Sequence, residues 1–220
     1  MVSGSDNATN IRSIMQQNNT HSRSVTNTWL SCITIAFFFL LVFTLQVQAQ
    51  TIAEEKTSGT EWAFLSGYGS SHPGWGETET RVETIDLVLR RSSILIDNIG
   101  GDAWYSGYHS LFLELPVHFL VNYSGPPMIG INFLASYTFT ATSVKPYVFI
   151  GGGPVYVDAD IPGMGSDWNG NYQLGAGLRV NLNDDHSLLF EARYHHISNA
   201  NTSDPNEPLN STKFLFGITF

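Results

Sequence analysis

Several segments of this chain alternate apolar and polar residues with a period of two, and this alternation constrains the fold more than any other feature. Successive side chains of a β-strand point to opposite faces, so the alternation predicts strands with one apolar and one polar face. Turn-forming residues separate these segments, which predicts an all-β fold. The predicted strands cover about 61–70, 81–91, 110–121, 129–139, 145–157, 171–181, 186–198 and 211–220.

The predicted strands suit an eight-stranded antiparallel transmembrane β-barrel. Each has roughly nine to thirteen residues, the length of a tilted strand across an outer membrane. The alternative is a soluble β-sandwich or a lipocalin-like barrel, whose apolar face would point inward. Aromatic residues on the apolar faces and the terminal Phe220 favour the membrane form. Side chains fill the lumen of so small a barrel, which disfavours a narrow pore.

The connections between strands predict which end of the barrel is extracellular. The turns at about 140–144 and 182–185 are short, which is typical of periplasmic turns, whereas the connections at about 71–80, 158–170 and 199–210 are longer. Residues 92–109 do not fit this pattern. They form either a long periplasmic turn or bulged extensions of the second and third strands, and the sequence does not decide between the two.

The first 49 residues have the pattern of a signal peptide with a long polar n-region, which leaves residues 50–220 as one barrel domain. An apolar run precedes small residues at Val47 and Ala49, so we expect cleavage after Ala49. Met15 is an alternative start. An uncleaved membrane anchor over about residues 29–47 is the competing interpretation.

Residues 50–220 carry eight Lys and Arg against eighteen Asp and Glu, a net charge of −10. This acidic balance, without a basic cluster, argues against nucleic acid as a partner. Cys32 is the only cysteine and lies within the apolar run. The barrel domain therefore has no disulfide, no thiol nucleophile and no cysteine ligand for a metal.

The strand predicted at 186–198 ends in residues that can carry chemistry. Leu188, Phe190, Ala192 and Tyr194 share one face by parity, and His196 and Ser198 continue that apolar face toward the outer leaflet. Residues two apart on a strand are separated by roughly 6.6 Å, a gap that an imidazole and a serine hydroxyl can bridge. A histidine that removes the hydroxyl proton makes serine a nucleophile. This placement predicts an enzyme that acts on a lipid.

The surrounding residues resemble a known family. The resemblance rests on the motif Phe190-x-x-Arg193-Tyr194-x-His196-x-Ser198-Asn199-Ala200, followed by Pro205-Asn206 and a last strand that ends in phenylalanine. It is similar to the motif of PagL-type lipid A 3-O-deacylases, sharply over about 190–220 and only in architecture over 61–181. The resemblance implies an outer-membrane barrel that hydrolyses an ester-linked acyl chain of lipid A, with lipopolysaccharide as substrate and no cofactor or metal.

The resemblance also implies roles for individual residues. Ser198 would be the nucleophile, His196 the general base, and Asn199 with the adjoining backbone the oxyanion donor. The family's glutamate follows its serine by about twelve residues, and here Asn210 stands at that place. Asn210 could orient His196 through its amide oxygen, or Glu207 or Asp204 could reach in from the loop. Glu207 is favoured because it is the acid nearest to the last strand.

Other interpretations follow from the same residues. His195 faces the lumen by parity, and we expect it to be a hydrogen-bonded interior residue beside Glu191 and Arg193. A metal pair of His195 and His196 is excluded because adjacent strand residues face opposite ways. A non-catalytic adhesin or surface-structural barrel is the alternative function. It would have long binding loops, whereas the loops here are modest. A homodimer is left open.

Overall fold

The computed structural model describes residues 59–220, so the predicted signal peptide at residues 1–49 lies outside the described residues. The described part is all-β. Its strands are β1 Thr60–Ser71, β2 Glu83–Ile99, β3 Gly107–Leu120, β4 Met128–Gly130, β5 Asn132–Phe139, β6 Val144–Tyr156, β7 Trp168–Asn181, β8 Ser187–Ser198 and β9 Leu209–Thr219. None of these residues belongs to a helix long and apolar enough to cross a membrane.

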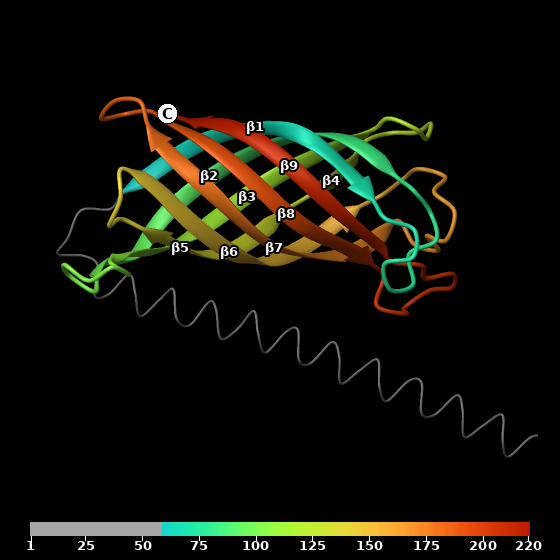
Figure 1. Ribbon diagram of the computed structural model, residues 1–220. Coiled ribbons are helices and arrows are strands. Elements are labelled where there is room, and N and C mark those ends of the chain that lie inside the picture. The colour runs from blue at the N-terminus through green and yellow to red at the C-terminus, as the bar shows by residue number, and fades with distance from the viewer. Residues whose placement is uncertain (1–58) are drawn as a thin grey trace, which may run out of the picture. The chain divides into compact units, whose positions relative to one another are not determined.

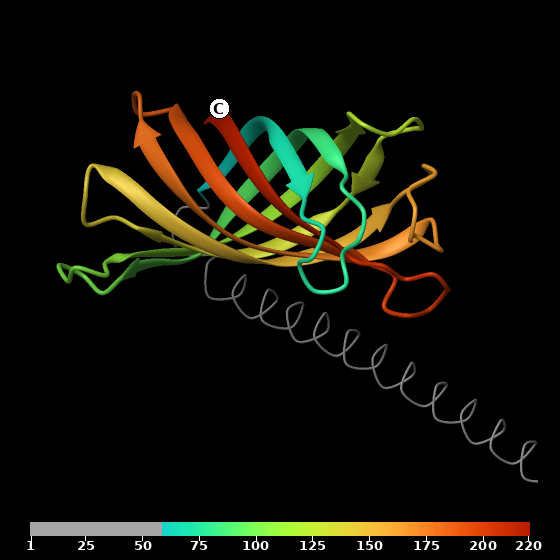
Figure 2. The same cartoon turned by 45° about the vertical axis from the view of Figure 1, so that its right-hand side comes forward.

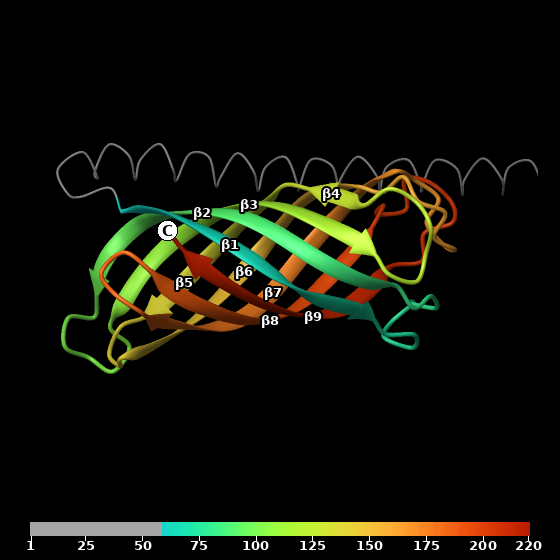
Figure 3. The ribbon, with the colours of Figure 1, turned by 90° about the horizontal axis from the view of Figure 1, so that it is seen from above.

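The strands close into a barrel, as Figures 1 and 3 show. Every pairing is antiparallel, and β1 pairs with both β2 and β9, so the first and last strands meet. β4 and β5 are one interrupted strand, because both lie between β3 and β6. The described residues therefore form the predicted eight-stranded antiparallel barrel.

The interruption between β4 and β5 has a local cause. By register, Pro116 of β3 lies opposite Gly130, at the break. Proline has no backbone N–H to donate to the ladder, so regular pairing lapses there. The backbone N–H of Ile131 still donates to the Pro154 carbonyl at 3.1 Å, which keeps the two pieces on one path.

The structure decides the conformation of residues 92–109, which the sequence left open. β2 extends to Ile99 and β3 begins at Gly107, so the strands lengthen instead of forming a long turn. The register shifts twice, between Ile94 and Ile96 and again between Ile96 and Ile99. Such bulges accommodate extra residues in one strand and increase its twist.

The longer loops gather at one end of the barrel (Figure 1). The three longest, at 72–82, 157–167 and 199–208, share that end with the connection at 121–127, whereas the connections at 100–106, 140–143 and 182–186 lie at the other end with Phe220. Figure 2 shows the β1–β2 loop and the β8–β9 loop side by side at the first end, which we call the loop end. The two are joined there by a hydrogen bond from the Thr78 hydroxyl to the Pro208 carbonyl at 2.7 Å, and the His72 N–H donates to the carbonyl of Asn210 in β9 at 2.9 Å.

The barrel carries its apolar side chains outward and its charged side chains inward. Phe214, Ile150 and Leu174 are 63%, 59% and 54% exposed, whereas Arg90 and Glu114 are fully buried. A lipocalin-like barrel in water would have the opposite polarity. An apolar exterior around a polar interior is typical of outer-membrane barrels, so the structure resembles these and not the soluble alternative.

Ion pairs fill the middle of the lumen. Glu114 accepts hydrogen bonds from Arg90 Nε at 2.8 Å and from Arg193 Nη1 at 2.9 Å, and Arg90 also pairs with Glu191 at 2.6 Å. Nearer the loop end, Asp86 pairs with Lys213 at 2.6 Å and with His118 at 2.8 Å. Buried charges persist only when they are paired and hydrogen-bonded, and here each carboxylate meets two donors.

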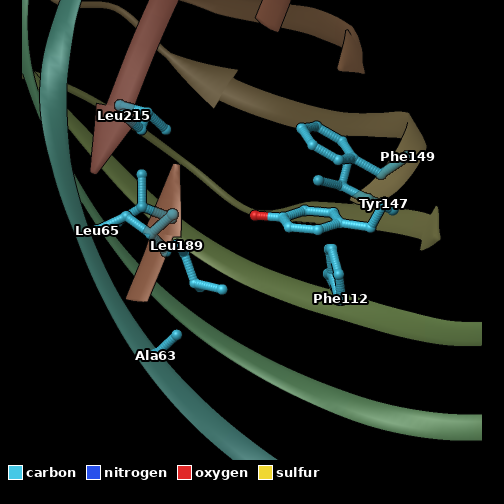
Figure 4. Close-up of a cluster of buried hydrophobic side chains, with 9 residues drawn as sticks. Ala63, Leu65, Phe112, Tyr147, Phe149, Leu189 and Leu215 are labelled. Carbon is cyan, nitrogen blue, oxygen red and sulfur yellow. The ribbon is translucent and has the colours of Figure 1, made fainter. Parts of the chain in front are cut away.

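Two apolar clusters share the lumen with these ion pairs. In Figure 4, the aromatic rings of Phe112, Tyr147 and Phe149 lie opposite Leu65 and the neighbouring leucines. A second cluster lies under the loops and contains Val82, Met128, Val155, Val157, Ile161, Ile197 and Leu209. The loop end is therefore closed by packed side chains, which argues further against the narrow pore.

Candidate active site

The pairing of β8 with β9 brings together the residues that the sequence singled out. Even-numbered residues of β8 face outward: Phe190 is exposed, and His196 and Ser198 are half-buried, whereas His195 and Ile197 are buried in the lumen. In the ladder His196 lies directly opposite Asn210. Side chains directly opposite each other in antiparallel strands have Cβ atoms only about 5 Å apart, so the Asn210 amide reaches the imidazole.

His196 bonds to both neighbours. Its Nε2 lies 2.9 Å from Ser198 Oγ, and its Nδ1 lies 2.7 Å from Asn210 Oδ1. The predicted pair thus meets within hydrogen-bond distance at the last residue of β8. The three side chains have the nucleophile, base and orienting-group order of serine hydrolases, with an amide in place of the acid.

Asn210 is held by the β1–β2 loop. Its Nδ2 donates to the Trp75 carbonyl and to Thr78 Oγ1, each at 2.8 Å, and its backbone N–H donates to the same Thr78 oxygen at 3.0 Å. Thr78 in turn donates to the Pro208 carbonyl at 2.7 Å. The sequence carried no signal for Trp75 or Thr78, since both lie more than 130 residues away from Asn210 along the chain.

Glu207, the favoured third group, lies elsewhere. It precedes β9, and its backbone N–H donates to the Gly163 carbonyl at 2.9 Å. Its side chain packs against Gly163: a Cβ added to that glycine would lie only 2.3 Å from Glu207 Oε2. Among residues 59–220, no hydrogen bond joins Glu207 or Asp204 to His196. Asn210 therefore takes the orienting position in this structure, because register against β8, and not proximity in sequence to β9, decides which residue meets the imidazole. A catalytic role for Glu207 stays a prediction.

Asn199 is engaged in hydrogen bonds within its own loop. Its Nδ2 donates to the Ser203 carbonyl at 2.8 Å and its backbone N–H donates to Asn206 Oδ1 at 2.8 Å. These bonds fold the β8–β9 loop, as asparagine side chains often do in turns. Both donors are thus engaged within the loop. The oxyanion prediction now depends on the adjoining backbone, where Ala200 and Asn201 have φ values of 55° and 60°.

Aromatic side chains surround the imidazole on the outer face. The Tyr172 ring stacks on His196 with centroids 4.4 Å apart and planes at 22°, and Trp75 lies over Tyr194 at 6.5 Å. The Tyr194 hydroxyl donates a hydrogen bond to Asn210 Oδ1. Parity already placed Tyr194 on this face, but not in contact with the site.

His195 lies in the lumen as parity predicted, 1% exposed and 5.4 Å from His118 between ring centroids. Neither of its ring nitrogens has a hydrogen-bond partner among residues 59–220. The expectation of a hydrogen-bonded residue beside Glu191 and Arg193 was wrong on that point, because Arg193 is already engaged by Glu114, Gln173 and Glu191.

A comparison with protein families identifies the chain. A family model described as Lipid A 3-O-deacylase (PagL) matches residues 95–219, from the end of β2 through β9, which is more than half of the chain. The chain belongs to this family. The matched residues include Ser198, His196 and Asn210, whereas Trp75 and Thr78 lie outside them.

Solved structures are similar to this PagL-family barrel at low sequence identity. The crystal structure of Neisserial surface protein A (NspA) has a TM-score of 0.51 and 14% identity, and the match covers 74% of this chain and 98% of that one. The crystal structure of the outer membrane enzyme PagL has a TM-score of 0.47 and 18% identity, with 72% and 98% covered. The NspA match shows the fold alone. A comparison with curated proteins finds no match.

Proposed function

We propose that this PagL-family chain is an outer-membrane esterase that hydrolyses an ester-linked acyl chain of lipid A, the 3-O-linked chain that the family's description names. The observation that carries the proposal is the unbroken hydrogen-bond chain Ser198–His196–Asn210 on the outward face of β8 and β9. Below it on β8 lie Phe190 and Ala192, which are exposed and suit contact with acyl chains. An ester held at the boundary between the apolar face and the loops would meet the serine hydroxyl.

The reaction proceeds through an acyl-enzyme. His196 Nε2 takes the Ser198 proton while Oγ attacks the ester carbonyl carbon, and a backbone N–H beyond Asn199, at Ala200 or Asn201, stabilises the oxyanion. The intermediate collapses, and the sugar oxygen leaves with the proton from Nε2. A water molecule, deprotonated by His196 Nε2, then attacks the acyl carbonyl carbon; the bond to Ser198 Oγ breaks, Oγ takes the proton back from Nε2, and the fatty acid leaves. Each step needs only these side chains and water, so no cofactor is proposed.

Mass spectrometry of lipid A from cells with and without this protein tests the proposal. We expect a new lipid A species that lacks one acyl chain, and free fatty acid in equal amount. An unchanged lipid A profile, with the barrel folded and present in the outer membrane, would contradict the proposal. That result would favour the surface-structural alternative.

We expect Asn210, and not Glu207, to orient His196. Replacing Asn210 with alanine removes the acceptor of the Nδ1–H, and we expect kcat to fall about ten- to a hundredfold, the equivalent of one or two hydrogen bonds. Glu207→Ala is the matched control from the same loop and strand boundary, and its kcat should change less than about threefold. Kinetics of both variants on a short-chain ester would decide between them. A larger loss in Glu207→Ala would restore the acid as the orienting group.

The loop end repels anions. The described loops there carry one basic residue, Arg81, against Glu77, Glu79, Asp158, Asp160, Asp167, Asp204 and Glu207. Phosphate groups of lipid A would meet this negative field, which salt screens over about 10 Å at 0.1 M. We expect deacylation of phosphorylated lipid A at low ionic strength to speed up when NaCl or MgCl2 is added, while an uncharged ester shows no such change. Inhibition by salt would mean that attraction, and not repulsion, governs substrate approach.

A further inference from the structure

The Asn210 amide serves the site only if its oxygen, and not its nitrogen, faces His196. The two ends of an amide have nearly the same shape, and a half-turn about the last side-chain bond exchanges them. With the nitrogen toward the ring, Nδ1 would become the acceptor and the proton would move to Nε2. Nε2 could then no longer take the proton of Ser198. The orientation of one neutral side chain therefore decides whether the base is available.

Two acceptors from the β1–β2 loop select the required orientation. The Trp75 carbonyl can only accept, and it receives Asn210 Nδ2 at 2.8 Å. Thr78 Oγ1 donates its one proton to the Pro208 carbonyl at 2.7 Å, so toward Asn210 Nδ2 it can act only as an acceptor. If the Asn210 amide were turned, its oxygen would face the Trp75 carbonyl and Thr78 Oγ1, and neither could donate a hydrogen bond to it. Thr78 is 2% exposed, so water cannot replace the lost bonds.

The orientation of the Asn210 amide also affects the Ser198 hydroxyl. With Nδ2 committed to Trp75 and Thr78, Oδ1 accepts from His196 Nδ1 at 2.7 Å and from the Tyr194 hydroxyl. The imidazole proton then resides on Nδ1, because the partner of one ring nitrogen determines the tautomer. Nε2 is left with its lone pair directed at Ser198 Oγ, 2.9 Å away.

We propose that Thr78 is a positioning residue of this hydrolase: it holds the Asn210 amide in the orientation that keeps the His196 proton on Nδ1 and Nε2 free for Ser198. The inference rests on the proposed function. It also assigns a role to the β1–β2 loop, which lies outside the residues matched by the family model. The site is thus built from three parts of the chain that closure of the barrel brings together.

The shape of the β1–β2 loop suits this role. Gly74 and Gly76 both have positive φ, at 90° and 58°, a conformation that glycine adopts without strain. The Gly74 N–H donates to the Thr78 carbonyl at 2.8 Å, which tightens the turn. A Cβ on Gly76 would lie 3.4 Å from Asn210 Nδ2. The backbone therefore passes close enough to the amide for a carbonyl and a hydroxyl to reach it together.

The test compares three variants of the loop in detergent-solubilised full-length barrel. Thr78→Val keeps the shape but removes the oxygen, Thr78→Ser keeps the oxygen, and Thr80→Val is the matched control, because Thr80 Oγ1 bonds only to the Pro162 carbonyl. We expect Thr78→Val to lower kcat about tenfold with KM unchanged, the loss of about one hydrogen bond in the transition state. Thr78→Ser should stay within about threefold of the original enzyme, and Thr80→Val likewise.

Imidazole 15N NMR of His196 gives a readout that a merely structural role would not move. We expect one tautomer, protonated on Nδ1, in the original protein, in Thr78→Ser and in Thr80→Val, and a mixture of tautomers in Thr78→Val. If folding of Thr78→Val is reduced, the spectrum of the folded fraction still reports the tautomer. An unchanged tautomer in Thr78→Val, or equal losses of kcat in Thr78→Val and Thr80→Val, would overturn the proposal.

A double-mutant cycle with Asn210→Asp sharpens the result. A carboxylate presents oxygen in either orientation, so Thr78 no longer determines which atom faces His196. We expect Thr78→Val to lower kcat less than about threefold in that background, against about tenfold in the Asn210 protein. Equal losses in both backgrounds would contradict the positioning role. Activity that survives in Ser198→Ala would instead defeat the proposed function, and the tautomer experiment would still test Thr78 by itself.

Discussion

Replacing Ser198 with alanine is expected to abolish deacylation of lipid A, with a fall in kcat of about 10⁴-fold or more. The loss should be this large because, in the proposed mechanism, Ser198 Oγ forms the acyl-enzyme and its hydrogen bond to His196 Nε2 activates it. The barrel should fold as before, since the serine is half-buried on the outer face at the end of β8. Mass spectrometry of lipid A from expressing cells measures the outcome.

Ser203→Ala is the matched control for this experiment. Ser203 lies in the same β8–β9 loop, and its hydroxyl donates to the Gly165 carbonyl at 2.7 Å, so the change removes one loop contact without touching His196. We expect that variant to retain deacylation. If Ser198→Ala still deacylates at the original rate, Ser198 is not the nucleophile. If both serine variants lose activity to the same degree, loop structure and not nucleophilic chemistry accounts for the loss.

Replacing Glu114 with alanine is expected to be the most destabilising single change in the lumen. Glu114 is fully buried and accepts from both Arg90 and Arg193. Its removal leaves two buried guanidinium groups that share one carboxylate, that of Glu191. Breaking a buried ion pair from one side costs about 3–5 kcal/mol of unfolding free energy, because the remaining charge is uncompensated. Urea unfolding of the detergent-solubilised barrel, followed by the folded band on gels, measures the change.

The ion pair between Glu61 and Arg179 provides the comparison. Its two side chains are 26% and 21% exposed, and both hydrogen bonds are 2.6 Å long. Water can solvate Arg179 once its partner is gone, so Glu61→Ala should lower the unfolding free energy by only about 1 kcal/mol. Equal urea midpoints for Glu61→Ala and Glu114→Ala would show that burial does not govern the strength of these pairs.

The barrel could be predicted from sequence because its pattern is local. Hydrophobic and polar residues alternate within each strand. This alternation predicted both the β-strands and the outward face of His196 and Ser198. The ends of β2 and β3 were harder to predict. Residues 92–109 contain two register shifts, which depend on how two strands pair and not on the alternation within either one.

The third member of the site shows the same limit. Glu207 carries the chemistry that a triad usually needs, and it precedes the last strand by two residues. Asn210 has weaker chemistry but sits opposite His196 in the ladder. Position across strands outweighs residue type, because an orienting group must lie within about 3 Å of the imidazole nitrogen. Asn199 differed for a related reason, since a turn that needs both its donors forms around it.

The sequence by itself determined which face carries His196 and Ser198, the proposed base and nucleophile, because residues two apart on one strand keep the same side whatever the rest of the fold does. Only the tertiary structure decided what orients the base. Trp75, Thr78 and Asn210 meet because β1 closes the barrel against β9 and carries its loop to the start of that strand. No spacing along the chain encodes such a contact. It depends on the register of strands that are neighbours in space and distant in sequence.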